Sequence, residues 1–118
     1  MADTAIPNTQ LVLNTPLTNP TGTAIVAANN HVITPTKATG RVLIRLTNTF
    51  AGAKVFTIAA GSNPPADAAG QGAITQSLAQ NEVWWVVVES SRVMKSNGTI
   101  VVTVEASTTG FIAAFQLP

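Results

Sequence analysis

Residues 41–48 read Arg-Val-Leu-Ile-Arg-Leu-Thr-Asn, and this stretch decides the fold class. Its side chains alternate in character: Val42, Ile44 and Leu46 fall on one side, and the other side carries Arg41, Leu43, Arg45 and Thr47. Successive side chains of a strand point to opposite faces, so this period of two predicts a β-strand with one face in a core.

The same texture recurs along the rest of the chain. Segments rich in β-branched and aromatic residues cover residues 53–59, 83–89, 99–105 and 111–117, and Gly, Asn, Pro or Ser separate them. No amphipathic helical pattern of about ten residues or more occurs. The sequence therefore predicts an all-β protein, a small antiparallel β-sandwich or a partly open barrel. We expect Ile44, Val102 and Val104 in its core.

The N-terminal part differs from the rest. Residues 1–23 contain Pro7, Pro16 and Pro20, which remove backbone donors and exclude a helix. We interpret residues 1–23 as an extended arm and residues 24–118 as one domain. Residues 10–14 suit a short edge strand, so two interpretations stay open: the arm binds a partner, or it pairs within its own sandwich.

The remaining segments carry weaker signals. We expect short strands at residues 24–28 and 31–34 around an Asn29-Asn30 turn, a loop over 61–73, a weak strand or helical turn over 75–81, a helical turn over 89–95 and a tight turn at Asn97-Gly98.

Composition excludes several functions. The chain has 118 residues, only 9% of them charged, with a net charge of +1 and no cysteine. Ordinary soluble domains carry about 25% charged residues. Binding to nucleic acid or an anionic membrane needs clustered Lys and Arg, which this chain lacks. The longest apolar run, residues 83–88, is too short for a membrane helix, and the start lacks the features of a signal peptide.

The sequence also lacks the residues that chemistry requires. His31 is the only histidine, and no Gly-x-Ser-x-Gly elbow accompanies it. The acidic residues are too few and too scattered for paired carboxylates or a metal site. We therefore expect no enzymatic activity, no cofactor and no metal, and a function that depends on a surface.

Trp84-Trp85 lies in the apolar segment 83–89. That segment is apolar on both faces, as in a central strand covered on both sides or in a strand whose outer face is an interface. Adjacent strand residues point to opposite faces, so only one tryptophan can enter the core. The other is a candidate for a protein interface or for stacking against a sugar.

The order of these strands and turns resembles the head decoration, or capsid cement, proteins of tailed bacteriophages. The resemblance covers residues 32–117 and rests on Arg41-Val-Leu-Ile-Arg-Leu-Thr-Asn48, Val55-Phe-Thr-Ile-Ala59, Ser77-Leu-Ala-Gln-Asn-Glu82 and Gly98-Thr-Ile-Val-Val-Thr-Val104. It implies a β-sandwich on the outside of a capsid, often a trimer, that reinforces joints between major capsid subunits. The family offers no catalytic residues. The double tryptophan and the N-terminal segment depart from its pattern.

We therefore expect a non-enzymatic structural protein of the virion, located on the capsid surface after synthesis in the host cytoplasm. Its expected partners are the major capsid protein and other copies of itself, with no nucleic acid, membrane or cofactor. The residues expected to contact the capsid or a neighbouring subunit are Ile6, Pro7, Leu11, Val12, Leu13, Pro16, Trp84 and Trp85. The rival interpretations are a tail or head-fibre subunit and a carbohydrate-binding module.

Overall fold

Every element whose bounds the structure describes is a β-strand, which confirms the all-β fold class. The computed structural model describes residues 2–35, 41–61, 72–89, 93–95 and 98–118. Its strands are β1 (Asp3–Ile6), β2 (Asn8–Gln10), β3 (Thr23–Ala24), β4 (Asn30–Ile33), β5 (Arg41–Asn48), β6 (Lys54–Ile58), β7 (Ile74–Leu78), β8 (Val83–Glu89), β9 (Ile100–Val104) and β10 (Gly110–Gln116).

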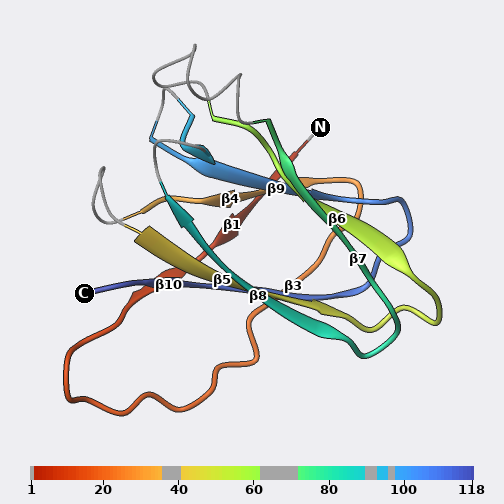
Figure 1. The fold of residues 1–118 in the computed structure, drawn as a ribbon. Helices are drawn as coiled ribbons and strands as arrows, with labels where there is room; N and C mark the ends of the chain where they lie inside the picture. Colours follow the sequence, from red (N-terminus) through yellow and green to blue (C-terminus); the bar gives the residue numbers. More distant parts are fainter. Residues whose placement is uncertain (1, 36–40, 62–71, 90–92, 96–97) are drawn as a thin grey trace.

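The strands form two sheets packed against each other (Figure 1). Sheet A has the order β1-β4-β9-β6-β7, and sheet B has the order β2-β10-β5-β8, with β3 also paired to β10. Most neighbours are antiparallel, but β1 runs parallel to β4 and β2 runs parallel to β10. The predicted β-sandwich is confirmed, with two parallel pairings that an antiparallel sandwich does not include.

The core lies between the sheets, and alternating strands build it. Val42, Ile44 and Leu46 of β5 are buried, as the period of two predicts. The core residues that sheet A contributes are Ile6, Ile33, Phe56, Ile58, Leu78, Ile100 and Val102. Val104 is only partly buried and packs against this cluster near the end of β9. The core assignment therefore holds for Ile44 and Val102, and in part for Val104.

The first residues belong to the sandwich itself. β1 extends sheet A, β2 extends sheet B, and Pro7 lies where the chain passes from one sheet to the other. Ile6 is only 4% exposed and is part of the core. Residues 3–10 therefore pair within their own fold, as the second interpretation of the arm requires, and the boundary expected at residue 23 does not match the structure. The part that remains without strands is the loop of residues 11–22, which we call the β2–β3 loop.

Other segments differ from the expectation for reasons of pairing. The strand expected over residues 10–14 ends at Gln10, because its partner β10 ends at Gln116; the Leu11 N–H bonds to the carbonyl of that last residue at 2.8 Å. β3 and β4 do not form a hairpin, because β3 joins sheet B while β4 joins sheet A. β7 confirms a strand within 75–81. The helical turn over 89–95, the turn at Asn97-Gly98 and the loop over 61–73 lie wholly or partly outside the described residues.

β8 occupies the edge of sheet B, where β5 is its neighbour. The interpretation of residues 83–89 as a central strand is therefore wrong, and the alternative, a strand with an uncovered outer face, describes β8.

The buried side chain of Asn48 connects the turn after β5 to the end of β7: its Nδ2 donates to the carbonyls of Gly52 (2.9 Å) and Leu78 (2.8 Å), and its Oδ1 accepts from the Phe50 N–H at 3.0 Å. All its polar atoms have partners, so burial of the amide is compensated.

Candidate functional site

No group of three or more His, Asp or Glu residues that could hold a metal ion exists among the described residues. Glu82 accepts from the Ala79 N–H at 3.0 Å, and Glu105 accepts from the Val55 N–H at 3.1 Å. These carboxylates therefore bind backbone groups at strand ends and turns. The described part of the chain also contains no helix long and apolar enough to cross a membrane.

The side chain of His31 is buried and hydrogen-bonded inside the fold. Its side chain is fully buried, Nε2 accepts from the Val26 N–H at 3.1 Å, and Nδ1 lies 3.2 Å from the Val102 carbonyl oxygen. Because Nε2 accepts, Nδ1 carries the proton and donates to Val102. Burial lowers the pKa of His31 below its ordinary value of 6.5, and the hydrogen bond to Val102 opposes this shift only in part. A neutral, buried ring bound on both nitrogens is not available to a substrate.

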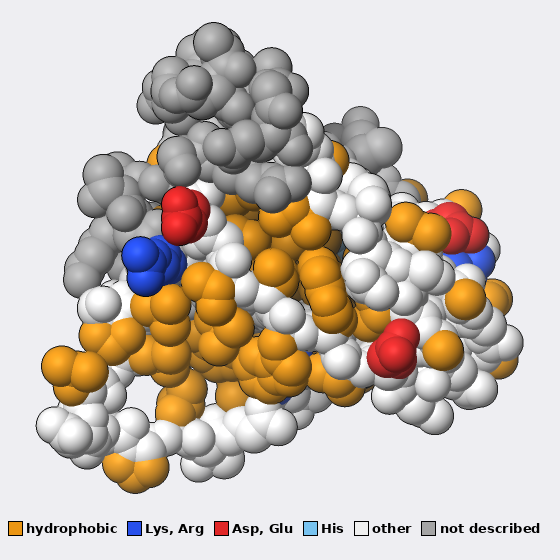
Figure 2. Space-filling view, viewed as in Figure 1, with side chains coloured by type: hydrophobic (Ala, Val, Ile, Leu, Met, Phe, Trp, Pro, Cys, Tyr) orange, Lys and Arg blue, Asp and Glu red, His pale blue; other side chains and the backbone are white. Residues whose placement is uncertain are grey.

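The outer face of sheet B, in contrast, is apolar and partly uncovered. We define it by the side chains that point away from the core on three adjacent strands: Leu43 on β5, Val83, Trp85 and Val87 on β8, and Phe115 on β10. Trp85 and Val87 are each 50% exposed. The rings of Trp85 and Phe115 stack across β5 with centroids 6.2 Å apart. Figure 2 shows an apolar patch over β5 and β8, with charged side chains at its margin.

One arginine fastens the β2–β3 loop to this face. Arg45 lies on the outer side of β5, is 6% exposed, and donates from Nη1 to Oδ1 of Asn19. Its Nη2 donates to the carbonyls of Pro20 at 2.6 Å and Thr21 at 2.9 Å. The guanidinium also lies 5.7 Å from the centroid of the Trp85 ring. The loop supplies the acceptors that a buried guanidinium requires, so Arg45 holds residues 19–21 on the sheet.

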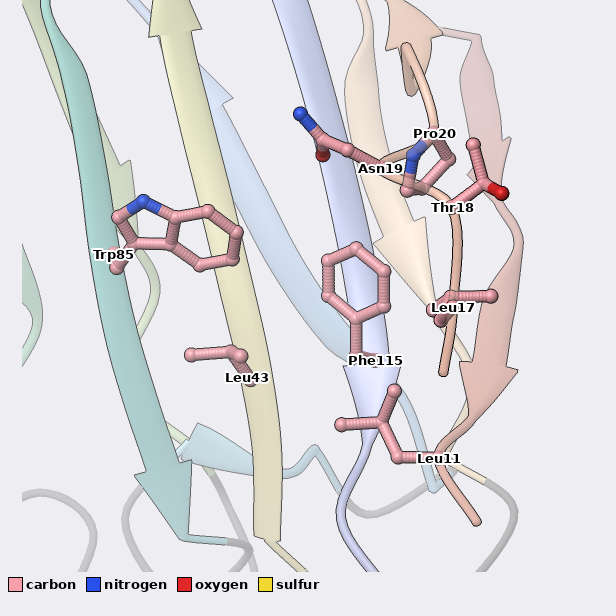
Figure 3. A pocket seen from close by; sticks show the side chains of 8 residues that line it. All are labelled: Leu11, Leu17, Thr18, Asn19, Pro20, Leu43, Trp85 and Phe115. Carbon is pink, nitrogen blue, oxygen red and sulfur yellow. The ribbon is translucent and has the colours of Figure 1, made fainter. Parts of the chain in front are cut away.

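A groove of about 300 Å³ separates the β2–β3 loop from the sheet. Trp85, Leu43 and Phe115 form one wall, and the loop forms the other (Figure 3). The loop side consists of Leu11, Leu17, Thr18, Asn19 and Pro20. At the free side of the loop, Val12 and Leu13 are 60% and 72% exposed. The outer face and the loop therefore make one continuous apolar surface.

The predicted contact residues divide into three groups. Leu11 and Trp85 line the groove, while Pro7, Val12, Leu13 and Pro16 are exposed but do not line it. Trp84 points inward and packs against the core, so Trp85 is the exposed member of the pair. Ile6 is a correction: it is a core residue, and a partner cannot contact it while the sandwich is folded.

Sequence reasoning missed the rest of the surface. Leu43 and Phe115 line the groove, and Arg45 anchors the loop, but none of them was a candidate. A signal existed, because alternation in 111–117 gives Phe111 and Phe115 one common face. The sequence does not say which face of this segment is buried. The register with β5 places Ile112 and Ala114 in the core.

Such a surface is suited to binding another molecule. It provides apolar area, two stacked rings and few polar atoms, which is the composition of a protein interface core. Comparisons with protein-family models, with curated protein sequences and with solved structures find no match to this chain.

Proposed function

We propose that this protein is a non-enzymatic structural component of a phage virion, a decoration protein that binds the outside of the capsid and stabilises the head shell. The observation that carries the proposal is the apolar outer face of sheet B, continuous with the β2–β3 loop. Exposed apolar patches on a protein mark sites that bind other molecules, other proteins among them. The strand order that resembles decoration proteins supports the same function.

The physical basis of the attachment is burial of apolar area on the major capsid protein. With 9% charged residues, the chain has little charge to desolvate when its surface is covered. Each contact can be weak, because a shell repeats the binding site many times and linked subunits gain from multivalency. The proposed activity needs no cofactor, metal or nucleic acid, and places the protein on the capsid surface.

Cosedimentation with shells tests this proposal. Capsids of the source phage, prepared without this protein, are mixed with the purified chain and pelleted. Trp85→Ala should lower the affinity for shells by about tenfold or more, as expected for a central aromatic contact. Val55→Ala is the matched control, because Val55 is also an exposed apolar strand residue, at 40%, but belongs to sheet A. Equal binding by both variants, or no binding by the parent, would contradict the proposal.

A carbohydrate-binding module is the second candidate, since Trp85 is exposed and Asn19 and Thr18 border the same groove. A sugar platform needs polar side chains around the ring to recognise hydroxyl groups. Here the Oδ1 of Asn19 accepts from Arg45, and Leu11, Leu17, Leu43 and Phe115 form most of the lining. We therefore expect no change in Trp85 fluorescence when glycans are added, and saturable quenching by a glycan would favour this candidate. A tail or head-fibre subunit would instead cosediment with purified tails or fibres when these replace the capsids in the assay.

A further inference from the structure

The free edge of β8 is the strongest feature that the proposed function leaves unused. β8 runs for 7 residues and pairs with β5 in continuous register from Arg41↔Glu89 to Thr47↔Val83, without a bulge. No other described strand pairs with its second edge. Edge strands are usually short, charged, bulged or interrupted by proline, because an open backbone edge recruits other strands. β8 has none of these protections along Val83 to Val88.

The hydrogen bonds of the neighbouring strand show which backbone groups of β8 are free. The Leu117 N–H donates to the Arg41 carbonyl, so Arg41 directs its backbone toward β10. The Asn48 N–H donates to the Glu82 carbonyl, so Asn48 directs its backbone toward the β8 side. Hydrogen-bonded pairs alternate along antiparallel strands. Alternation between these ends means that Val42, Ile44 and Leu46 bond to β8.

The partners of those β5 residues are Val88, Val86 and Trp84, whose backbone groups therefore face β5. The N–H and C=O groups of the intervening residues point away from β5: Val83, Trp85, Val87 and Glu89. None of these four residues donates or accepts a backbone hydrogen bond at that edge within the described part of the chain. The edge thus presents an ordered row of donors and acceptors.

The other open edges differ from β8. β7 is the far edge of sheet A, and its middle residues are the polar Thr75, Gln76 and Ser77. The opposite edges of the two sheets are formed by short strands, β1, β2 and β3, which have 4, 3 and 2 residues. β8 combines length, an unprotected backbone and exposed apolar side chains, so it is the edge best suited to recruit a strand.

We propose that the free edge of β8 pairs with β8 of a second copy of this chain, antiparallel and about a two-fold axis at Val86. The pairing itself does not depend on the proposed function. Only its consequence, a doubled shell-binding face, rests on that function. The register follows from the free groups: pairing Val83 with Glu89 and Trp85 with Val87 places every free N–H of one copy opposite a free C=O of the other. A two-fold contact uses the same patch on both copies and closes, so it stops at a dimer.

The side chains suit this register. On the outer face Trp85 lies beside Val87 of the second copy, an aromatic and β-branched pair of the kind that stabilises sheets. Glu89 is the only charged residue of β8, and it lies opposite Val83 rather than opposite another carboxylate. On the inner side, Trp84 and Val86 are only partly buried against the core, and a second copy would cover them further. A second copy is therefore the occupant that this edge fits.

The pairing would join the two copies of sheet B into one continuous sheet. Their outer faces, with Trp85 of each copy near the axis, would then form a single apolar surface. Two linked faces bind a repeating shell more tightly than one.

Light scattering during size-exclusion chromatography tests the pairing without capsids. The parent should elute as a concentration-dependent dimer. Val87→Pro removes a free donor and should raise the dimer dissociation constant by about tenfold or more, with the β5 ladder kept. A proline at position 55 would disturb sheet A and is not a suitable control. Val55→Ala lies on a face that the pairing does not involve, so it is the control and should leave the dimer dissociation constant unchanged. A parent that stays monomeric at all concentrations, or that forms the trimer expected from the resemblance, would overturn the proposal.

Cysteine placement tests the register, because the chain has no cysteine of its own. Val86→Cys puts the two thiols opposite each other at the axis, in a pair without hydrogen bonds, where side chains approach most closely. Mild oxidation should give a covalent dimer in high yield. Val83→Cys, in the same strand and more exposed, should give little, because it lies opposite Glu89. Equal yields from the two variants would contradict the two-fold register.

The outcomes also separate this proposal from the proposed function. A monomer that still binds shells refutes the β8 pairing and leaves the decoration function in place. A dimer that binds no shell refutes the decoration function and leaves the pairing in place.

Discussion

His31 shows how one buried side chain can make folding depend on pH. Its ring connects the Val26 N–H to the carbonyl of Val102 in β9, and both contacts require the neutral tautomer with the proton on Nδ1. Protonation of Nε2 would break the contact with Val26 and place a charge in the core.

We predict that the protein loses stability as the pH falls from about 7.5 to about 5.5. The pKa of His31 is lowered in the folded state, so its full contribution is present above the unfolded value of 6.5. Below that value the unfolded chain binds a proton that the folded chain excludes, and the contribution declines until the pH reaches the folded pKa. Urea melts across this range measure the slope. His31→Gln should flatten it, and an unchanged slope would assign the effect to other groups.

Arg45 is the second side chain whose effect can be isolated. Arg45→Met keeps most of the apolar stem but leaves Asn19 and two carbonyls of the β2–β3 loop without their donor. We expect a loss of about 1–3 kcal/mol in the free energy of unfolding and faster cleavage of the loop by a protease that cuts beside leucine. Arg41→Met, on the same strand but exposed, is the control. If both variants were cut at the same rate, Arg45 would not hold the loop.

At the scale of elements, the N-terminal strands matter most for the stability of the isolated protein. Ile6→Ala should cost about 2–4 kcal/mol, because it opens a cavity between the sheets. Val12→Ala, only six positions along but 60% exposed, should change stability by less than about 0.5 kcal/mol. Thermal or urea melts of the two variants make the comparison. Deletion of residues 2–20 should likewise collapse the fold, whereas an unchanged melting curve would mean that β1 and β2 are dispensable.

The elements that the sequence predicts are those whose pattern is local. β5, β6 and β9 alternate clearly, and their periodicity indicates both the strand and its buried face. β10 is apolar on both faces, so its composition indicates the strand but not the face. β1 and β2 are short, and Asp-Thr-Ala-Ile and Asn-Thr-Gln show no such pattern. They are strands because β4 and β10 offer open edges, which is information from distant parts of the chain.

The candidate surface, like the strands, can be predicted from local sequence only in part. Alternation predicts that one of Trp84 and Trp85 faces outward, but the choice depends on register: Trp84 lies opposite the buried Leu46, and Trp85 lies opposite Arg45. The position of β8 at an edge depends on the order of strands in the sheet. No local pattern contains that order, so the sequence alone is equally compatible with a central strand.

For the whole molecule, the low charge makes a prediction about salt. Attachment through the outer face of sheet B should change by less than about twofold between roughly 0.05 and 0.5 M NaCl, because screening acts on charges and not on apolar area. The cosedimentation assay at several salt concentrations measures this. A steep loss of binding with salt would indicate that charged contacts, rather than the face around Trp85, carry the attachment.

The parallel pairing of β1 with β4, and of β2 with β10, has a mechanical consequence. β2 lies beside β10, close to the end of the chain, and both strands run in the same direction. When the two ends of the chain are pulled apart, the force on β2 acts toward its start and the force on β10 acts toward its end. The pair is therefore loaded in shear, so its hydrogen bonds must break together rather than one after another. β1 meets the same load against β4. The sandwich should resist tension between its ends better than one whose terminal strands can be unzipped.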